Sequence, residues 1–376
     1  MKVRLLHALS VATVVVGATT AAVTGTAGTA GALVPAKHTN VKVTIDDDGC
    51  PAKLTVPAGP ATFKVSNEGD GSVSEFEVLS DGRIIGEVEN IAPGLHGSFS
   101  LTLKPGAYST KCPGGSEHET GKLTVTGTAD TKLTPSQQSS VDTYRTYLED
   151  QTAQLVTATD AFVAAVKAGN VDLAKQLYAA ARIPYERIEP VAETFGDLDP
   201  KIDARKGDVP DKEWGGFHKI EQALFVGNTT DGMSDVATEL QADVATLANL
   251  MGSVELQPAA VANGAVELLN EVSASKITGE EERYSRLDLV DFAANVEGAR
   301  AAFDAVKPLL TGKNAALASQ IGTRFGAVDA ALVPYRAGTS YVLYTSLAPS
   351  DTKSLSQVID ALAEPLSTVA KHLVKQ

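Results

Sequence analysis

The chain has 376 residues, with 32 Lys and Arg against 46 Asp and Glu, and a formal net charge of −14. That length leaves room for two domains, each able to bury a core. Apolar residues make up 43 % of the chain, which excludes wholesale disorder, and the acidic balance argues against nucleic acid as a partner. Two cysteines are too few for a disulfide scaffold, an iron–sulfur cluster or a cysteine-rich zinc site.

Residues 1–32 have the pattern of a signal peptide. Lys2 and Arg4 form a short positive region, an apolar run follows, and Ala30-Gly31-Ala32 is typical of a signal peptidase cleavage site. A membrane anchor is the alternative, but the apolar run approaches the ~20 residues of a span only if many Gly, Ala and Thr count as apolar. We therefore expect an exported, extracytoplasmic protein, either periplasmic or secreted.

Residues 41–127 alternate apolar and polar side chains, with turn signals rich in Gly and Pro between the runs. Several short strands of this kind predict a small β-sandwich, with linkers at 33–40 and 128–136. The expected strands lie within Val41–Ile45, Ala61–Val65, Phe76–Val78, Gly97–Leu101 and Lys122–Val125.

Residues 137–376 have apolar side chains spaced three and four apart, which predicts an α-helical bundle. The fold class is therefore all-β followed by all-α. Thr278-x-x-Glu281 and Ser285-x-x-Asp288 are patterns of helix N-terminal caps. The expected helices are Ser136–Ala168, Val171–Phe195, Trp214–Phe225, Ser234–Ser253, Pro258–Ser275, Ser285–Leu309, Asn314–Leu332 and Ser356–Lys375.

Three carboxylates stand at positions i, i+3 and i+7 of one predicted helix: Glu186, Glu189 and Glu193. On a helix they form one stripe, and their mutual repulsion must be relieved by solvent or by a cation. Pro190 removes a backbone hydrogen bond there, frees the carbonyl of Glu186 and predicts a kink beside the stripe. A solvated helix face is the alternative interpretation.

His218 and Glu221 stand one turn apart in Gly216-Phe217-His218-Lys219-Ile220-Glu221. A neutral imidazole and a carboxylate at this spacing are natural ligands for a divalent metal, whereas a hydrogen-bonded core histidine is the alternative. An acidic turn at 196–205 contains Asp203 and is short enough to lie near both helices. A second acidic run at 279–288 is expected mainly to cap a helix, with Glu282 or Asp288 able to complete a metal shell.

The sequence offers little support for an enzyme. Metallopeptidases of this kind carry the motif H-E-x-x-H or its reversed form H-x-x-E-H. This chain has H-x-x-E from His218 to Glu221, but Gln222 stands where the second His of the reversed motif would be. Neither a G-x-S-x-G motif, a phosphate-binding loop nor a dinucleotide fingerprint is present. Several carboxylates with one His favour hard or borderline cations such as iron, which zinc could replace.

Cys50 and Cys112 both fall in the predicted β-sandwich. In an exported protein such a pair is by default a disulfide, and the alternative is a metal site that uses both sulfurs and an acid such as Glu75. A blue-copper centre needs two His and one Cys, usually with a Met, and the three Met residues all lie outside this region. An ordinary type 1 copper site is therefore disfavoured.

Four spaced motifs run through the helical region: Y-E-R-I-E-P-V-A-E, G-D-L-D-P-K-I-D-A-R, G-F-H-K-I-E and I-T-G-E-E-E-R-Y-S. With the export signal and the β-sandwich before them, they give the mature chain a strong resemblance to the EfeO family of extracytoplasmic iron-binding proteins. The resemblance implies a cupredoxin-like β-sandwich and an α-helical bundle of imelysin type. It also implies capture of iron and delivery to a membrane permease of EfeU type, with a haem peroxidase of EfeB type as third component.

The resemblance further implies two metal sites. The helical site would use residues that match the family motifs, namely His218, Glu221, Glu186, Glu189 and Asp203, and the β-domain site would use Cys50, Glu75 and Cys112. The implied cargo is iron as Fe²⁺ or Fe³⁺, with copper an alternative in the β-domain, where it would assist iron oxidation. One departure is Arg286, where the family pattern has His; Asp288 is retained.

We therefore expect a metal-binding transport component rather than an enzyme. Two other interpretations stay open at this point. One is an imelysin-type metallopeptidase, and the other is a cupredoxin-like electron-transfer module fused to a structural bundle.

Overall fold

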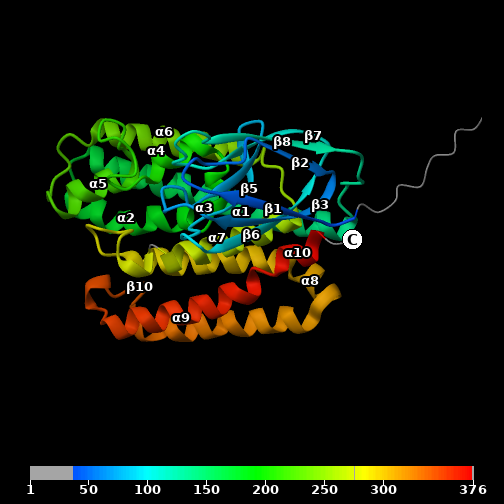
Figure 1. The fold of residues 1–376 in the computed structure, drawn as a ribbon. Coiled ribbons are helices and arrows are strands. Elements are labelled where there is room, and N and C mark those ends of the chain that lie inside the picture. Colours follow the sequence, from blue (N-terminus) through cyan, green and yellow to red (C-terminus); the bar gives the residue numbers. More distant parts are fainter. Residues whose placement is uncertain (1–36, 275, 375–376) are drawn as a thin grey trace, which may run out of the picture. The chain divides into compact units, whose positions relative to one another are not determined.

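A computed structural model describes residues 37–274 and 276–374, so the predicted signal peptide lies outside the described residues. Eight strands come first in the described chain, and the long helices follow them (blue to cyan, then green to red, in Figure 1). This order confirms the predicted class of an all-β region followed by an all-α region. The described residues belong to one compact unit. Within the described ranges, no helix combines the length and the apolar character needed to cross a bilayer.

The strands form two sheets of a sandwich. The smaller sheet has the order β1-β3-β6 and the larger the order β2-β8-β7-β4-β5. Alternating burial, as along β8, turns one face of each strand to a core in which the rings of Phe63 and Phe99 stack with their centroids 5.0 Å apart. The strands are β1 Thr39–Ile45, β2 Lys53–Pro57, β3 Gly59–Asn67, β4 Phe76–Ser80, β5 Arg83–Val88, β6 His96–Leu103, β7 Gly106–Lys111 and β8 Thr120–Thr126.

The five predicted strands are present, and β2, β5 and β7 are additional. The β5 sequence Arg83-Ile84-Ile85-Gly86-Glu87-Val88 does not alternate cleanly, because its two isoleucines are adjacent and Glu87 is buried. A buried glutamate on a sheet breaks the polar-out rule on which the sequence prediction depends. This is why sequence analysis missed the strand.

The helices bury one continuous core that extends from α1 to α10. They are α1 Pro135–Lys167, α2 Val171–Glu186, α3 Glu189–Glu193, α4 Asp199–Asp203, α5 Gly216–Phe225, α6 Ser234–Met251, α7 Pro258–Ala274, α8 Asp288–Leu332, α9 Pro349–Leu366 and α10 Val369–Val374. A short 3₁₀ turn, Lys276–Thr278, follows α7, and a two-residue hairpin pairs Arg336–Ala337 with Ser340–Tyr341.

One predicted helix, Val171–Phe195, is wrong as a single element. The chain ends α2 at Glu186 and begins α3 at Glu189, so Pro190 stands in the first turn of a new helix, where its missing N–H costs nothing. The Glu186 carbonyl has no helical partner because α2 ends at that residue, and not because of Pro190; it accepts from the Asn295 amide at 2.8 Å. Gly298 of α8 packs against the Arg187 backbone at the break, where an added Cβ would lie 2.4 Å from the carbonyl oxygen.

Two predicted caps are also wrong. Thr278 ends the 3₁₀ turn instead of starting a helix, and α8 begins only at Asp288. The acidic run between them forms irregular turns whose carboxylates point to other partners, described below. The sequence predicts two helices where the structure has the single helix α8. A local break remains between them at Asn314, which has non-helical backbone angles and whose side chain accepts from the Leu317 N–H.

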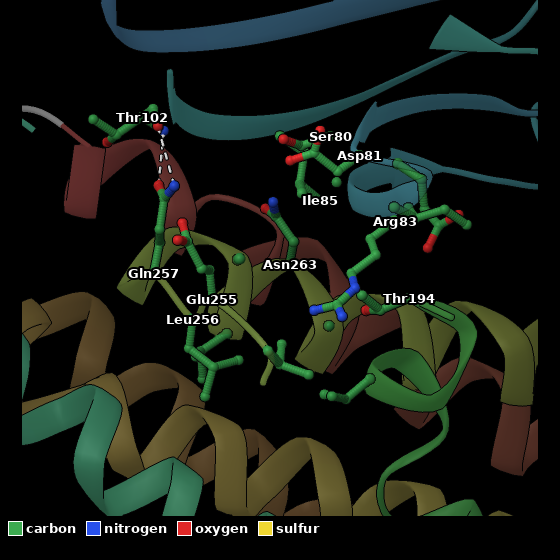
Figure 2. A pocket seen from close by; sticks show the side chains of 18 of the residues that line it. Ser80, Asp81, Arg83, Ile85, Thr102, Thr194, Glu255, Leu256, Gln257 and Asn263 are labelled. Carbon is green, nitrogen blue, oxygen red and sulfur yellow. Dashed lines mark hydrogen bonds between the residues drawn. The ribbon is translucent and has the colours of Figure 1, made fainter. Parts of the chain in front are cut away.

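Contacts between β6 and α7 join the strands to the helices. The side-chain amide of Gln257 donates to the Thr102 carbonyl and accepts from the Thr102 N–H, both at 3.1 Å (Figure 2). Asn263 donates to the Ser100 carbonyl at 3.1 Å. A cavity of about 670 Å³ lies beside these contacts, and its lining includes Arg83, Glu87 and Glu267.

Candidate metal centre

His218 lies in the first turn of α5, at a point where the backbone of α4 comes very close. Gly216, which starts α5, has φ +65°, and a Cβ there would lie 2.2 Å from the Ile202 carbonyl oxygen. Only glycine fits this approach. The close packing sets His218 directly beside Asp203, the last residue of α4.

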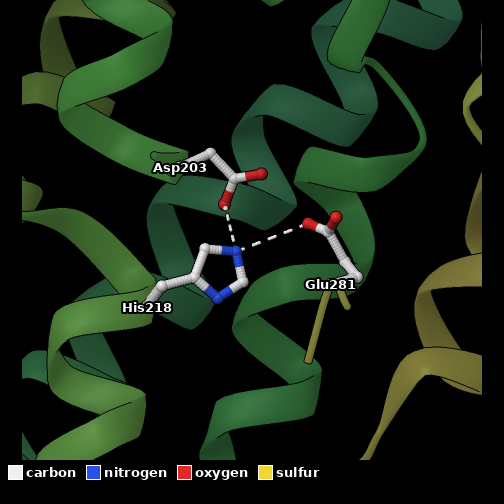
Figure 3. A group of neighbouring side chains, drawn as sticks. All are labelled: Asp203, His218 and Glu281. Atoms are coloured by element: carbon white, nitrogen blue, oxygen red, sulfur yellow. Dashed lines mark ion pairs between the residues drawn. The ribbon is translucent and has the colours of Figure 1, made fainter. Parts of the chain in front are cut away.

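The imidazole of His218 is surrounded by carboxylates. Its Nε2 lies 3.5 Å from Asp203 Oδ1 and 3.4 Å from Glu281 Oε1, and Figure 3 shows both carboxylates turned toward that nitrogen. The ring is 1 % exposed, and Nε2 has no hydrogen-bond partner of acceptable geometry among the described residues. The ligand atoms of the three side chains lie within 4.8 Å of one another. One imidazole nitrogen with carboxylate oxygens fits iron in either oxidation state.

The other ring nitrogen fixes the orientation of the imidazole. His218 Nδ1 donates to Glu221 Oε2 at 3.0 Å, and Glu221 Oε1 accepts from the N–H groups of Tyr284 at 2.9 Å and Ser285 at 2.7 Å. A carboxylate behind a histidine in this way is typical of metal sites, because it sets the tautomer and makes the other nitrogen a better ligand. Glu221 thus ties α5 to the acidic run that brings Glu281.

A fully buried arginine supplies positive charge to the same cluster. The Arg182 guanidinium contacts five carboxylates and lies with its carbon 5.5 Å from the centroid of the Phe217 ring. Its Nη2 lies 3.2 Å from Glu281, and its Nε lies 3.2 Å from Glu282. The carboxylates that it contacts are Glu186, Asp203, Glu281, Glu282 and Asp291.

Lys276 is the second buried cation. Its ammonium donates to Glu186 at 2.5 Å and to Glu189 at 2.8 Å, and it lies 3.4 Å from Glu271. Glu186 therefore stands between Arg182 and Lys276. The repulsion predicted for the glutamate stripe is relieved here by these internal cations, so the solvated-face alternative is wrong for Glu186 and Glu189, which are buried.

The electrostatics of the cluster favour an imidazole flanked by ionised carboxylates. Burial and the Arg182 charge lower the pKa of His218, but the hydrogen bond to Glu221 and the nearby Glu281 carboxylate outweigh them and raise it above its usual value. Burial raises the pKa of Glu281, whereas Lys276, His218 and Arg182 together bring it well below its usual range. The low pKa of Glu281 leaves its oxygens ready to bind a cation without releasing a proton.

The β-sandwich brings together a second set of acids. Oxygens of Glu75, Glu77 and Glu87 lie within 4.8 Å of one another, and Glu77 and Glu87 are direct cross-strand partners on β4 and β5. Glu77 is 2 % exposed, and its Oε2 has no hydrogen-bond partner among the described residues. Burial, with repulsion from Glu89 and Glu77, raises the pKa of Glu75 to about 9.

Cys50 and Cys112 form a disulfide in the structure, which is the alternative that the chemistry of an exported protein favours. A disulfide has no thiolate to offer a metal, so Cys50 and Cys112 could act as ligands only in a reduced chain. The prediction that Glu75 shares a metal site with them is replaced here by the carboxylate group on β4 and β5. Arg286, at the departure from the family pattern, donates to the Gly279 carbonyl at 3.3 Å.

Sequence analysis identified His218, Glu221, Asp203, Glu186 and Glu189, and the structure brings all five into one buried network. It missed Arg182, Lys276 and Glu281. Arg182 could have been found from its i, i+4 spacing to Glu186, which is typical of a helical ion pair. Glu281 was interpreted as a capping residue, and nothing in the sequence indicates that Lys276 is buried.

Known proteins resemble this chain in both its strands and its helices. A family model described as imelysin matches residues 140–369, and one described as a cupredoxin-like domain matches residues 9–125. The iron uptake system component EfeO of Escherichia coli (strain K12) is 42 % identical over 337 residues, which cover 87 % of this chain and 89 % of that protein. The EfeO of Shigella flexneri gives the same values. The chain belongs to the EfeO family.

The EfeO assignment covers both halves of the described chain and makes the protein a component of an iron uptake system. A solved structure titled as a novel purple cupredoxin from Nitrosopumilus maritimus matches 23 % of this chain and 99 % of that chain, with 18 % identity. Its TM-score of 0.19 is too low to add to the EfeO assignment.

Proposed function

We propose that this EfeO-family chain captures iron outside the cytoplasmic membrane and delivers it to an EfeU-type permease, with an EfeB-type haem peroxidase as a further component of the system. The observation that carries the proposal is the buried group of His218, Asp203 and Glu281, in which Nε2 lacks a hydrogen-bond partner among the described residues. A buried polar atom without a partner is costly, and an iron ion would remove that cost.

We assign the chain the role of a carrier rather than a peptidase. A metallopeptidase needs a carboxylate free to act on water beside the metal, as in the H-E-x-x-H motif. Glu221 is instead bound to His218 and to two backbone N–H groups, so its oxygens are already engaged. Metal-dependent cleavage of a protein substrate that disappears in Glu221→Gln would contradict this assignment.

We further propose that the Glu75, Glu77 and Glu87 group holds iron in the β-domain. Carboxylate oxygens are hard ligands that suit Fe²⁺ and Fe³⁺, and the disulfide-bonded chain has no thiolate to offer copper. Oxidation of ferrous iron assisted by copper would require the reduced cysteines. Zinc can substitute for iron at the helical site, since it accepts the same imidazole and carboxylate donors.

The proposal is tested by anaerobic titration of Fe²⁺ into the full chain, followed by tryptophan fluorescence. The chain has one tryptophan, Trp214, and its indole N–H donates to the carbonyl of Ala204, the residue after Asp203. We expect saturable quenching that weakens at least about tenfold in His218→Gln, since one ligand is lost. His96→Gln, on an exposed strand end, is the matched control. Equal quenching in both variants would contradict the assignment of the site.

A further inference from the structure

The carboxylates of the β-sandwich and those around His218 are joined by further half-buried glutamates. Two of these, Glu267 and Glu271, stand one turn apart on α7, and Glu193 stands one turn from Glu189 on α3. Residues at this spacing have Cβ atoms about 5–6 Å apart on one helix face. Each helix therefore presents a pair of acids along its length.

The first step of the connection lies at the sheet. Glu87 on β5 is the cross-strand partner of Glu77, and Glu89 lies two residues further along the chain. A small cavity of about 30 Å³ separates β5 and β6 from α7, and its lining includes Glu87, Glu89 and Glu267 with the amides of Asn263 and Asn270. This volume is that of one water molecule, and so also of one small ion. Glu87 and Glu267 also line the cavity of about 670 Å³.

The second step lies between α7 and α3. Gly264 of α7 packs against Pro190 of α3, where an added Cβ would lie 3.4 Å from the proline ring. The two helices are therefore in direct contact. Lys276 binds Glu189 at 2.8 Å and lies 3.4 Å from Glu271, so acids of both helices converge on one ammonium group.

The third step reaches the metal centre. Lys276 also binds Glu186 at 2.5 Å, and ligand atoms of Glu186, Glu189 and Asp203 lie within 4.8 Å of one another. Asp203 is the neighbour of His218 Nε2. Carboxylates thus follow one another from the sheet to the imidazole. At each end lies a buried atom that has no hydrogen-bond partner among the described residues, namely Glu77 Oε2 and His218 Nε2.

The acids along this line lie close enough to repel one another when they ionise. Burial and repulsion from Glu89 raise the pKa of Glu267 to about 8, and burial with repulsion from Glu89 and Glu87 raises the pKa of Glu193 well above its usual value. A divalent ion that moves along the line would relieve this repulsion at each position.

We infer that the glutamates between the two groups, Glu89, Glu193, Glu267, Glu271 and Glu189, form an acidic passage through which a divalent cation bound at the β-sandwich moves to His218 without returning to solvent. The inference rests on the proposed function, because it assumes that iron binds at both ends. A direct approach on the side of Arg205, which is partly exposed and pairs with Glu281 at 3.1 Å, is the competing route.

The test measures how fast Fe²⁺ reaches His218 in the full chain. Anaerobic stopped-flow mixing with less than one equivalent of Fe²⁺ gives the rate constant of Trp214 quenching. The passage variant combines Glu193→Gln with Glu267→Gln, which keeps the side-chain shape and removes two carboxyl groups. Glu255→Gln is the control, because this carboxylate also lies between strands and helices but is 79 % exposed and pairs with Lys104.

In the passage variant we expect the same final quenching as in the wild-type chain and a rate constant at least about tenfold lower. An amide cannot give up a proton to bind the ion as a carboxyl group can, so its barrier rises. The control should keep the wild-type rate. An unchanged rate in the passage variant, or a reduced final amplitude there, would overturn the passage alone. The single variant Glu267→Gln repeats the test with one substitution. We expect it to lower the rate constant of quenching by less than the double variant does.

Absence of any iron-dependent quenching in the wild-type chain would overturn the proposed function, and the passage with it. By contrast, a passage variant that binds iron fully and at the wild-type rate would overturn the passage and leave the proposed function unaffected. The two proposals therefore fail through different observations.

Discussion

Arg182 and His218 contact the same two carboxylates, Asp203 and Glu281. The guanidinium therefore provides, in the metal-free chain, part of the positive charge that the acids around the imidazole require. This arrangement holds the two acids together before a cation arrives, and it contributes to the low pKa of Glu281. The first prediction follows from it.

Arg182→Gln should lower the free energy of unfolding of the metal-free chain by about 3–5 kcal/mol, because it leaves buried carboxylates without a counter-charge. Urea unfolding in the presence of a chelator measures this. Lys104→Gln is the matched control, since it breaks an exposed pair with Glu255 and should cost less than about 1 kcal/mol. Equal losses in the two variants would show that Arg182 does not stabilise the cluster.

Glu221→Gln should weaken Fe²⁺ binding about 10–100-fold while the helical content stays unchanged. The amide has one accepting oxygen, so it can accept from the N–H groups of Tyr284 and Ser285 or from His218, but not from both sides, and the imidazole loses its fixed orientation. Isothermal titration under nitrogen, with circular dichroism for the fold, gives both values. The exposed Glu239→Gln on α6 should bind as the wild-type chain does, and a wild-type affinity in Glu221→Gln would contradict the role assigned to this carboxylate.

The stability of the metal-free chain should fall as the pH rises from about 5 to about 8. Burial raises the folded-state pKa of Glu271 and Glu89 to about 7 and that of Glu267 to about 8, from the ordinary glutamate value of 4.5. The folded chain thus holds protons that the unfolded chain has lost, and this stabilisation is present below the unfolded value and lost as the pH passes the folded one.

Thermal unfolding at constant ionic strength, with a chelator present, measures this pH dependence. Glu267→Gln should flatten the dependence, because it removes one of the groups responsible. The lowered pKa of Glu281 acts only at a pH below the ordinary carboxyl range, so it leaves this window unaffected. A melting temperature that rises between the two pH values would contradict the assigned shifts.

Removal of the disulfide by Cys50→Ser with Cys112→Ser should reduce the stability of the β-sandwich by about 4 kcal/mol, because the bond closes a loop with a sequence separation of 62 residues. Urea unfolding followed by far-ultraviolet circular dichroism measures the loss. Quenching of Trp214 by Fe²⁺ should still reach its wild-type final value, since the His218 group has no ligand from the sandwich. Loss of that quenching would show that the helical site depends on the disulfide.

Gly216→Ala should destabilise the chain by more than the ~1–2 kcal/mol of a left-handed alanine, since the added methyl group overlaps the Ile202 carbonyl. Gly232→Ala separates the two effects, because Gly232 also has a positive φ, +75°, but open space around it. Comparison of the two melting temperatures isolates the overlap. We also expect weaker Fe²⁺ binding in Gly216→Ala alone, because α5 carries His218.

Much of this organisation was predictable from the sequence, and the limits have physical causes. Period-two and period-three-to-four patterns located most strands and helices, and the H-x-x-E spacing located His218 and Glu221. The spacing of apolar and polar residues gave wrong predictions where polar residues are buried, as at Glu87 on β5 and Glu281 in the acidic run. Burial of such a group depends on a partner elsewhere in the chain, which the local pattern does not contain. Lys276 is the clearest case, since its partners on α2 and α3 are about 90 residues away in the sequence.

The break between α2 and α3 is two residues long, and this length constrains the positions of the carboxylates on the two helices. Glu186 ends one helix and Glu189 begins the next, and each reaches Lys276 from its own helix. One residue inserted at Arg187 or Ile188 would lengthen this short connection and let α3 move relative to α2, which would carry Glu189 away from the ammonium group. The length of this segment is therefore as much a determinant of the metal centre as the identity of its carboxylates, and a homologue could lose the centre through an insertion while it keeps every ligand.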